Sequence, residues 1–258
     1  MHDFLGYAPG TAMVVTGSGS GIGEAIALTA GKLGLKVASW DLSPEAAERT
    51  AAAIRAAGGD AIACAGDVSD KAVVADAWAR TTDAFGAVAC LAASAGPPSF
   101  GDKDFTSALN LAIDCMRLPT EGWLEQPDAG SRAAIYLSSV QGPRYGAGVP
   151  WYTVAKSGID GYMRSLAAMR PGGIRANAIL PDWLRTARTE QYIDATGGDG
   201  WETNPMGRVG YAQDSANAAI FLLSPAADYI NGISLEVDGG AKLRSMAWMR
   251  MWEASKSS

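Results

Sequence analysis

A tyrosine and a lysine at helical spacing are the residues of this 258-residue chain best suited to moving a proton. Tyr152 and Lys156 are four residues apart, which places both side chains on one face of a helix. A free phenol, with a pKa near ~10, is a weak base at neutral pH, but a neighbouring ammonium favours the phenolate. We therefore expect acid–base chemistry in which Lys156 lowers the pKa of Tyr152.

Ser139 lies 13 residues before Tyr152, at the end of a predicted strand. A hydroxyl in that place can donate a hydrogen bond to a substrate oxygen on which negative charge develops. Ser138 is the alternative, but the spacing favours Ser139.

The histidine and cysteine content excludes other chemistry. The only histidine is His2, so a Ser-His-Asp triad, a histidine base and a multi-histidine metal site are not expected, and we predict no metal. The three cysteines are widely spaced without a CxxC motif, which predicts reduced, buried thiols. They are Cys64, Cys90 and Cys115.

A glycine-rich turn follows the first predicted strand, with the spacing TGxxxGxG from Thr16 to Gly23. Glycine allows positive φ and lets backbone amides approach a phosphate, and the helix that follows directs its positive end at that phosphate. The turn predicts dinucleotide binding. Its predicted contacts are Gly17, Ser20, Gly21, Ile22 and Gly23.

Asp41 ends the second predicted strand, about 20 residues past the glycines, where a carboxylate can accept hydrogen bonds from the adenosine ribose. Its charge would repel a 2′-phosphate, no lysine or arginine lies in the glycine loop, and Leu42 follows it. NAD is therefore predicted over NADP. Asp67 and Val68 end the third strand, where Asp67 either accepts from the adenine amino group or caps the next helix.

Strands alternate with helices along the chain, which predicts a parallel sheet covered on both faces. The fold class expected is α/β, a single-domain doubly wound sheet over residues 1–258. A long segment at 182–210 follows a strand and is predicted to be a substrate loop, because ligands bind beyond the carboxyl ends of such strands. The expected strands are 12–16, 35–40, 60–65, 87–93, 133–137, 174–180 and 234–237, and the helices 21–33, 44–58, 69–85 capped by Ser69, 105–118, 151–169 and 214–223.

The composition of the chain excludes further classes of protein. Hydrophobic residues make up 48% of the chain and charged residues 19%, which predicts a large buried core. The net charge of −6 argues against a nucleic-acid partner. The sequence has no apolar run approaching ~18 residues, so we expect no membrane segment. Residues 1–10 lack a basic region and a long apolar core, so we expect no signal peptide and a cytoplasmic location.

Taken in order, these motifs resemble the short-chain dehydrogenase/reductase superfamily, in its TGxxxGxG/YxxxK branch, from Ala12 to Gly240. The resemblance implies a Rossmann fold, homo-oligomers, most simply tetramers, and a general acid/base at Tyr152. Lys156 would also bind the nicotinamide ribose, Ser139 would polarise a carbonyl, and Asn110 would hold a water that links the lysine to solvent. Further cofactor contacts would be Ala95, Gly96, Pro181 and Thr186.

Three departures from the family pattern stand out. The family's Asn-Ala-Gly reads Ser94-Ala95-Gly96, and its Pro-Gly reads Pro181-Asp182, which places a carboxylate near the nicotinamide site. Only 14 residues separate Gly96 from Asn110, about ten fewer than the family usually has.

Apolar and aromatic residues fall in segments that border the family's active site. Ser139, Tyr145, Trp151, Trp183 and Met206 are the predicted substrate pocket, although Trp151 and Trp183 could equally be core residues. Such a wall favours an apolar small-molecule substrate over a sugar, which would need several polar partners. We expect a bulky cyclic secondary alcohol or ketone of terpenoid, steroid or aryl type. The apolar tail, 241–258, is expected to pack between subunits or to act as a lid.

Two other functions compete with a secondary-alcohol dehydrogenase. An acyl-ACP or acyl-CoA ketoreductase would usually take NADPH and show a basic patch, which Asp41 and the acidic balance disfavour. A non-catalytic dinucleotide-binding sensor would not need Ser139, Tyr152, Lys156 and Asn110 together.

Overall fold

A seven-stranded, wholly parallel sheet forms the centre of the molecule, with the strand order β3-β2-β1-β4-β5-β6-β9. The computed structural model describes residues 2–99, 103–127, 129–144, 146, 148–169, 173–195, 204–243 and 255. The strands are β1 (Ala12–Thr16), β2 (Lys36–Asp41), β3 (Asp60–Ala65), β4 (Cys90–Ala93), β5 (Arg132–Leu137), β6 (Ile174–Pro181) and β9 (Ser234–Val237).

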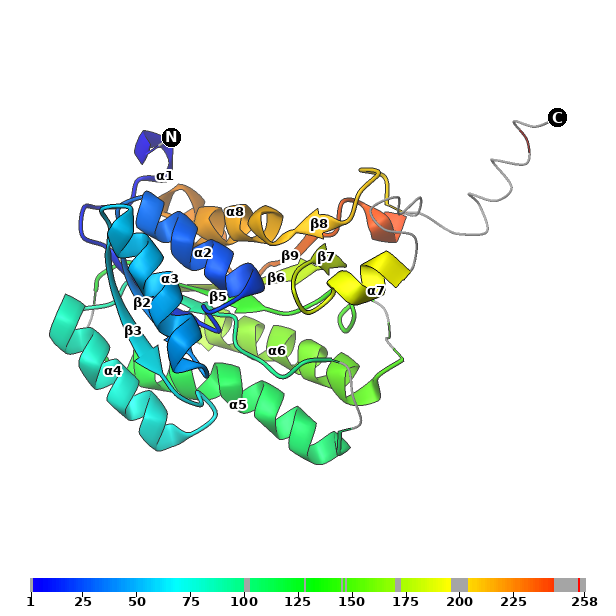
Figure 1. Cartoon of the computed structure of the whole chain (residues 1–258), viewed down its shortest axis with the longest axis horizontal. Coiled ribbons are helices and arrows are strands. Elements are labelled where there is room, and N and C mark those ends of the chain that lie inside the picture. Colours follow the sequence, from blue (N-terminus) through cyan, green and yellow to red (C-terminus); the bar gives the residue numbers. More distant parts are fainter. Residues whose placement is uncertain are drawn as a thin grey trace.

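Helices cover both faces of this sheet (Figure 1). One face carries α2 (Gly21–Lys32), α3 (Pro44–Ala56) and α8 (Ala212–Leu223), and the other carries α4 (Lys71–Phe85), α5 (Phe105–Leu124) and α6 (Pro150–Met169). Every residue of β1, β5 and β6 is buried, because helices lie on either side of these strands. The α/β doubly wound fold predicted from the sequence is therefore confirmed.

The strand order reverses between β1 and β4, which are neighbours in the sheet but not in the chain. Loops that leave the carboxyl ends of these two strands run in opposite directions and leave a crevice between them. The fold thus places the glycine turn, the ends of β4 and β5 and the start of the 182–210 segment around one opening.

Several elements differ in their bounds from the sequence prediction, and the largest difference is in α5. Helix α5 continues through Pro119 to Leu124, because tertiary contacts hold its last turns. Trp78 Nε1 donates to the Pro119 carbonyl at 3.1 Å, and Trp123 Nε1 donates to the Val88 carbonyl at 2.9 Å.

The 182–210 segment is less irregular than expected. Within its described residues, β7 (Leu184–Arg185) pairs with β8 (Gly210–Tyr211), and α7 (Glu190–Ala195) lies between them. The short elements α1 (His2–Leu5), η1 (Pro225–Ala227) and η2 (Ala241–Leu243) complete the described fold. None of the described helices combines the length and apolarity needed to cross a membrane.

Asp70, not the predicted Ser69, caps α4. Its carboxylate accepts from the backbone amides of Ala72 at 2.7 Å and Val73 at 3.3 Å. Ser69 instead donates to Asp67, through its amide at 2.9 Å and its hydroxyl at 2.7 Å.

We predict that Asp70→Ala lowers the free energy of unfolding by about 1 kcal/mol, because two amides at the start of α4 lose their acceptor. Ser69→Ala is the matched control and should cost less than half as much. Urea denaturation of both variants measures the difference. Equal losses would mean that Asp70 does not carry the cap.

Candidate active site

A cleft of about 610 Å³ opens along the carboxyl ends of the strands. At one end it is walled by the glycine turn, Asp41 and Asp67, and at the other by Ser139 and Tyr152. Parallel α/β sheets bind ligands at this edge. The predicted site residues that line it are Gly17, Ser20, Gly21, Ile22, Asp41, Leu42, Asp67, Val68, Ala95, Gly96, Ser139, Tyr152, Lys156, Pro181, Trp183 and Thr186.

The glycine turn packs directly against the end of β4. Gly17 has φ +64°, and a Cβ on it would lie 2.9 Å from the Cα of Ala95. Gly23 does not line the cleft, but a Cβ there would lie 2.1 Å from the carbonyl oxygen of Gly17. The two positions therefore exclude any side chain, and the turn presents bare backbone to the cleft at the start of α2.

Thr16 joins the two strands beneath this turn. Its Oγ1 accepts from the backbone amides of Ser94 and Ala95, each at 3.1 Å. Ser94, which stands where the family has asparagine, has its Oγ 3.2 Å from the position of a Cβ on Gly23. The small serine side chain thus fits beside the tight turn.

Asp41 is fixed at the end of β2 by backbone amides. Its Oδ2 accepts from Gly19 N at 2.8 Å, and its Oδ1 accepts from Ser43 N at 3.0 Å. Leu42 beside it is 71% exposed. The carboxylate is held in a single orientation at the wall of the cleft.

Arg49 is a cation near the glycine turn that the sequence did not predict. Arg49 of α3 donates to the carbonyl of Gly19 and lies 4.0 Å from the carboxylate of Glu24. It is eight residues beyond Asp41 in sequence, and α3 folds it back over the turn. Arg49 is not among the residues that line the cleft.

Helix α6 brings the tyrosine and lysine to the other end of the cleft. Lys156 Nζ lies 5.5 Å from the centre of the Tyr152 ring and donates to the carbonyl of Leu137 at 2.7 Å. Ser139 lines the cleft with Tyr152 and lies near enough to affect the pKa of its phenol, whereas Ser138 donates to the carbonyl of Lys156 at 2.9 Å. Of the two serines, Ser139 is therefore the one placed beside the phenol.

Burial, not the lysine, dominates the pKa of Tyr152. Desolvation raises that pKa, and the hydrogen bond from Ser139 and the positive charge of Arg188 oppose the rise. Burial, followed by the charge of Arg188, lowers the pKa of Lys156 to about 8. We expected Lys156 to lower the pKa of Tyr152. In the structure the positive charge that lowers this pKa, against the effect of burial, is that of Arg188.

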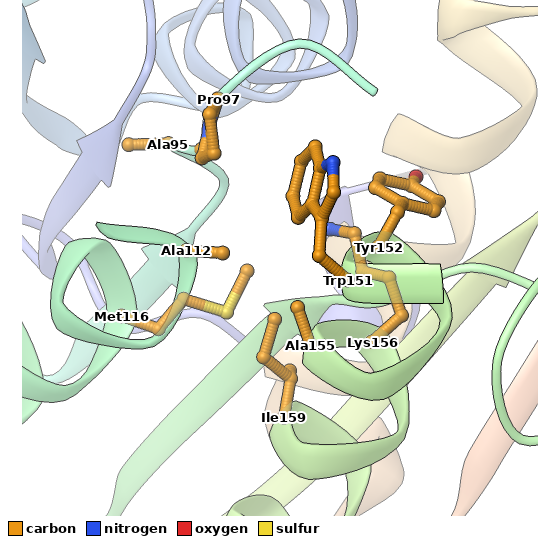
Figure 2. Close-up of a pocket in the computed structure, with 10 residues that line it drawn as sticks. Ala95, Pro97, Ala112, Met116, Trp151, Tyr152, Ala155, Lys156 and Ile159 are labelled. Atoms are coloured by element: carbon orange, nitrogen blue, oxygen red, sulfur yellow. The ribbon is translucent and has the colours of Figure 1, made fainter. Parts of the chain in front are cut away.

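Trp151 is not among the residues that line this cleft, but it lines a small neighbouring pocket together with Pro97 and Tyr152 (Figure 2). Its side chain is 4% exposed and packs with Ala108, Ala112 and Ala155. Its ring meets the Tyr152 ring edge-on, with 5.6 Å between their centres. Trp151 thus supports the tyrosine from behind.

Other predicted residues also fall elsewhere. Asn110 is exposed and does not line the cleft, because α5 turns Leu111 and Cys115, one helical turn apart, toward it instead. Met206 is 66% exposed and is also absent from the lining. Tyr145 and the tail beyond Leu243, apart from Ser255, lie outside the described residues.

Several lining residues carried no sequence motif. Pro97, Leu111 and Gln141 could only have been found from the fold, and Asp182 was noted without a role. Arg188 lines the cleft two residues beyond Thr186. In the part of the chain that the structure describes, no group of three or more histidine, cysteine or acidic residues is arranged to hold a metal.

We predict that Gly23→Ala weakens NADH binding at least ~10-fold, because the added Cβ would push the carbonyl of Gly17 and distort the turn. Gly161→Ala is the control, since a Cβ at Gly161 of α6 meets no atom within 4 Å. NADH fluorescence titration measures both. Unchanged affinity in Gly23→Ala would show that the turn does not hold the cofactor.

Comparison with known proteins agrees with this arrangement. A family model described as enoyl-(acyl carrier protein) reductase matches residues 17–242. The L-rhamnose 1-dehydrogenase (NAD(P)(+)) of Sphingomonas sp. (strain SKA58) is 32% identical, over 90% of this chain and 96% of that protein. The 2,5-dichloro-2,5-cyclohexadiene-1,4-diol dehydrogenase LinX of Sphingobium indicum is 33% identical, also over 90% of this chain and 96% of that protein.

Among solved structures, a short-chain dehydrogenase from Burkholderia cenocepacia J2315 in complex with NADP has 27% identity and a TM-score of 0.81. The match covers 90% of this chain and 98% of that one. With these relatives, this fold and this cleft, the chain belongs to the short-chain dehydrogenase/reductase superfamily.

Proposed function

We propose that this protein is an NAD(H)-dependent oxidoreductase that interconverts a secondary alcohol and a ketone. The observation that supports this proposal is a single cleft that has catalytic side chains at one end and a dinucleotide-binding turn at the other. Ser139, Tyr152 and Lys156 gather at one end, and the bare glycine turn and the fixed Asp41 stand at the other.

The residues present fit a dinucleotide. The turn offers backbone amides and the start of α2 to a pyrophosphate, and a Cβ at Gly17 or Gly23 would collide with the backbone of Ala95 or Gly17 and distort the turn. Thr186 lies across the turn, with its Cγ2 3.7 Å from the position of a Cβ on Gly21. A bound nicotinamide would accept or donate the hydride.

Each catalytic side chain then has a separate task. The Ser139 hydroxyl holds the substrate oxygen beside the phenol of Tyr152, and Tyr152 takes the hydroxyl proton in oxidation or returns it in reduction. Lys156, whose Nζ lies 5.5 Å from the centre of the Tyr152 ring, binds a hydroxyl of the nicotinamide ribose. A pKa of about 8 leaves its ammonium mostly protonated at neutral pH.

Asp41 supports NAD as the cofactor. A carboxylate held by two amides cannot turn away from a 2′-phosphate, so the phosphate would face an unscreened negative charge. Arg49, which is bound to the Gly19 carbonyl and does not line the cleft, offers no compensating contact there.

The substrate end of the cleft favours an apolar body. Trp183 lines it, as the sequence predicted, together with Pro97, Pro98 and Leu111. We propose a bulky cyclic secondary alcohol, although the aromatic wall is smaller than expected because Trp151 and Met206 do not contribute to it.

We expect Tyr152→Phe to reduce kcat by at least ~1000-fold with little change in NADH affinity, because only the proton-transferring hydroxyl is removed. Activity in both directions and NADH titration test this. Trp151→Phe is the control, since it keeps an apolar ring behind Tyr152 and should retain most of the activity. Retained turnover in Tyr152→Phe would overturn the proposed mechanism.

We expect Asp41→Ala to raise kcat/KM for NADP about 10-fold or more and to lower it for NAD, because the repelling carboxylate is gone. Steady-state kinetics with both cofactors measures the change, and Asp76→Ala, which removes an exposed carboxylate of α4 that does not line the cleft, is the control. A wild-type preference for NADP would remove the argument from Asp41 and favour the ketoreductase alternative.

A further inference from the structure

Of the described arginines at 144, 185, 188 and 208, in the segments that follow β5 and β6, all but one are paired with carboxylates. Arg185 lies 3.0 Å from Asp194, Arg208 lies 2.8 Å from Asp214, and Arg144 pairs with Glu236. Arg188 is exposed and lines the cleft, and no other described residue forms an ion pair or a hydrogen bond with its guanidinium.

Arg188 stands at the catalytic end of the cleft. Its charge acts on both Tyr152 and Lys156, and it shares the cleft wall with Ser139 and Trp183. The start of α2, where a pyrophosphate would bind, is lined instead by Ser20 and Gly21. The positive charge of Arg188 therefore reaches the catalytic end of the cleft.

We propose that Arg188 binds a carboxylate of the substrate, so that the preferred substrate is a hydroxy acid or oxo acid with an apolar ring. This inference rests on the proposed oxidoreductase function and narrows its substrate class. Guanidinium groups bind carboxylates through two parallel hydrogen bonds, which would fix the position of the hydroxyl-bearing carbon as well as add affinity.

The other charges in the cleft agree with an anionic ligand. Lys156 and Lys103 also line it, and the one described carboxylate in the segment between Pro181 and Arg188 is Asp182, which has contacts of its own. Of the described residues, three cations and three carboxylates line this cleft, and two of the carboxylates, Asp41 and Asp67, lie at the glycine-turn end, away from Tyr152. Because Arg188 is exposed, water solvates its guanidinium in the free protein, and a substrate carboxylate would replace that water.

The test uses matched pairs of substrates: hydroxy acids on cyclohexane and aromatic frames, each compared with its neutral methyl ester. For the wild type, kcat/KM for the acid should exceed that for the ester at least ~10-fold. Arg188→Gln should lower that ratio about 10- to 100-fold, and Arg188→Lys should restore part of it. The ratio cancels any change in the chemistry of Tyr152 that both substrates share.

A binding measurement keeps the inference testable without turnover. Calorimetry with cyclohexanecarboxylate and its neutral carboxamide, each added to the enzyme–NADH complex, should detect only the acid, and Arg188→Gln should lose it. Equal binding of both compounds, or an acid-to-ester ratio that Arg188→Gln leaves unchanged, would overturn the role of Arg188. Weakened NADH binding in Arg188→Gln would instead assign the guanidinium to a cofactor phosphate and likewise overturn it.

The two proposals fail in different ways. If the wild type binds NADH and the acid but transfers no hydride in either direction, the oxidoreductase proposal falls while the anion site stands. If esters turn over as well as acids, the oxidoreductase stands and the anion site falls.

Discussion

The close contact between the glycine turn after β1 and the end of β4 is the constraint on which the rest of the structure depends. Gly17 approaches Ala95 so closely that no Cβ fits, and Thr16 ties the two strand ends together. Because the loops that leave β1 and β4 run in opposite directions from this point, the contact between the strand ends sets both the floor of the cleft and its width. A bulkier turn would separate the two strands and move the cofactor site away from the catalytic end.

A second set of contacts joins α6 to the end of β5. Ser138 donates to the backbone of Lys156, and the Lys156 ammonium donates back to the backbone of Leu137. These two hydrogen bonds fix the helix relative to the strand that carries Ser139. The side chain of Tyr152 therefore lies near Ser139, just beyond the end of β5, and its ring contacts that of Trp151 edge-on.

Local patterns in the sequence were enough to predict much of this arrangement. The predicted bounds of β1, β3 and β9 agree with those in the structure. The residues predicted from spacing also line one cleft: glycines of the turn, Asp41, Ser139, Tyr152 and Lys156. These features depend on short-range geometry: a strand end, a turn or one helical turn. Such geometry can be read from residue spacing alone.

Features that depend on packing between distant elements could not be predicted. Asn110 misses the cleft because the rotation of α5 is set by its contacts with α6, and Trp151 is buried for the same reason. The length of α5 beyond Pro119 depends on the indole of Trp78, 41 residues away in sequence. The burial that raises the pKa of Tyr152, and the charge of Arg188 that opposes it, likewise come from segments remote in the chain.

The most direct test of the central claim follows reduced nicotinamide by its absorbance, with the purified protein, NAD or NADP, and a panel of cyclic secondary alcohols with and without a carboxylate. We predict reduction of NAD, faster than that of NADP, with turnover of the alcohols that depends on Tyr152. NAD binding without hydride transfer from any alcohol, and without NADH oxidation by the matching ketones, would contradict it.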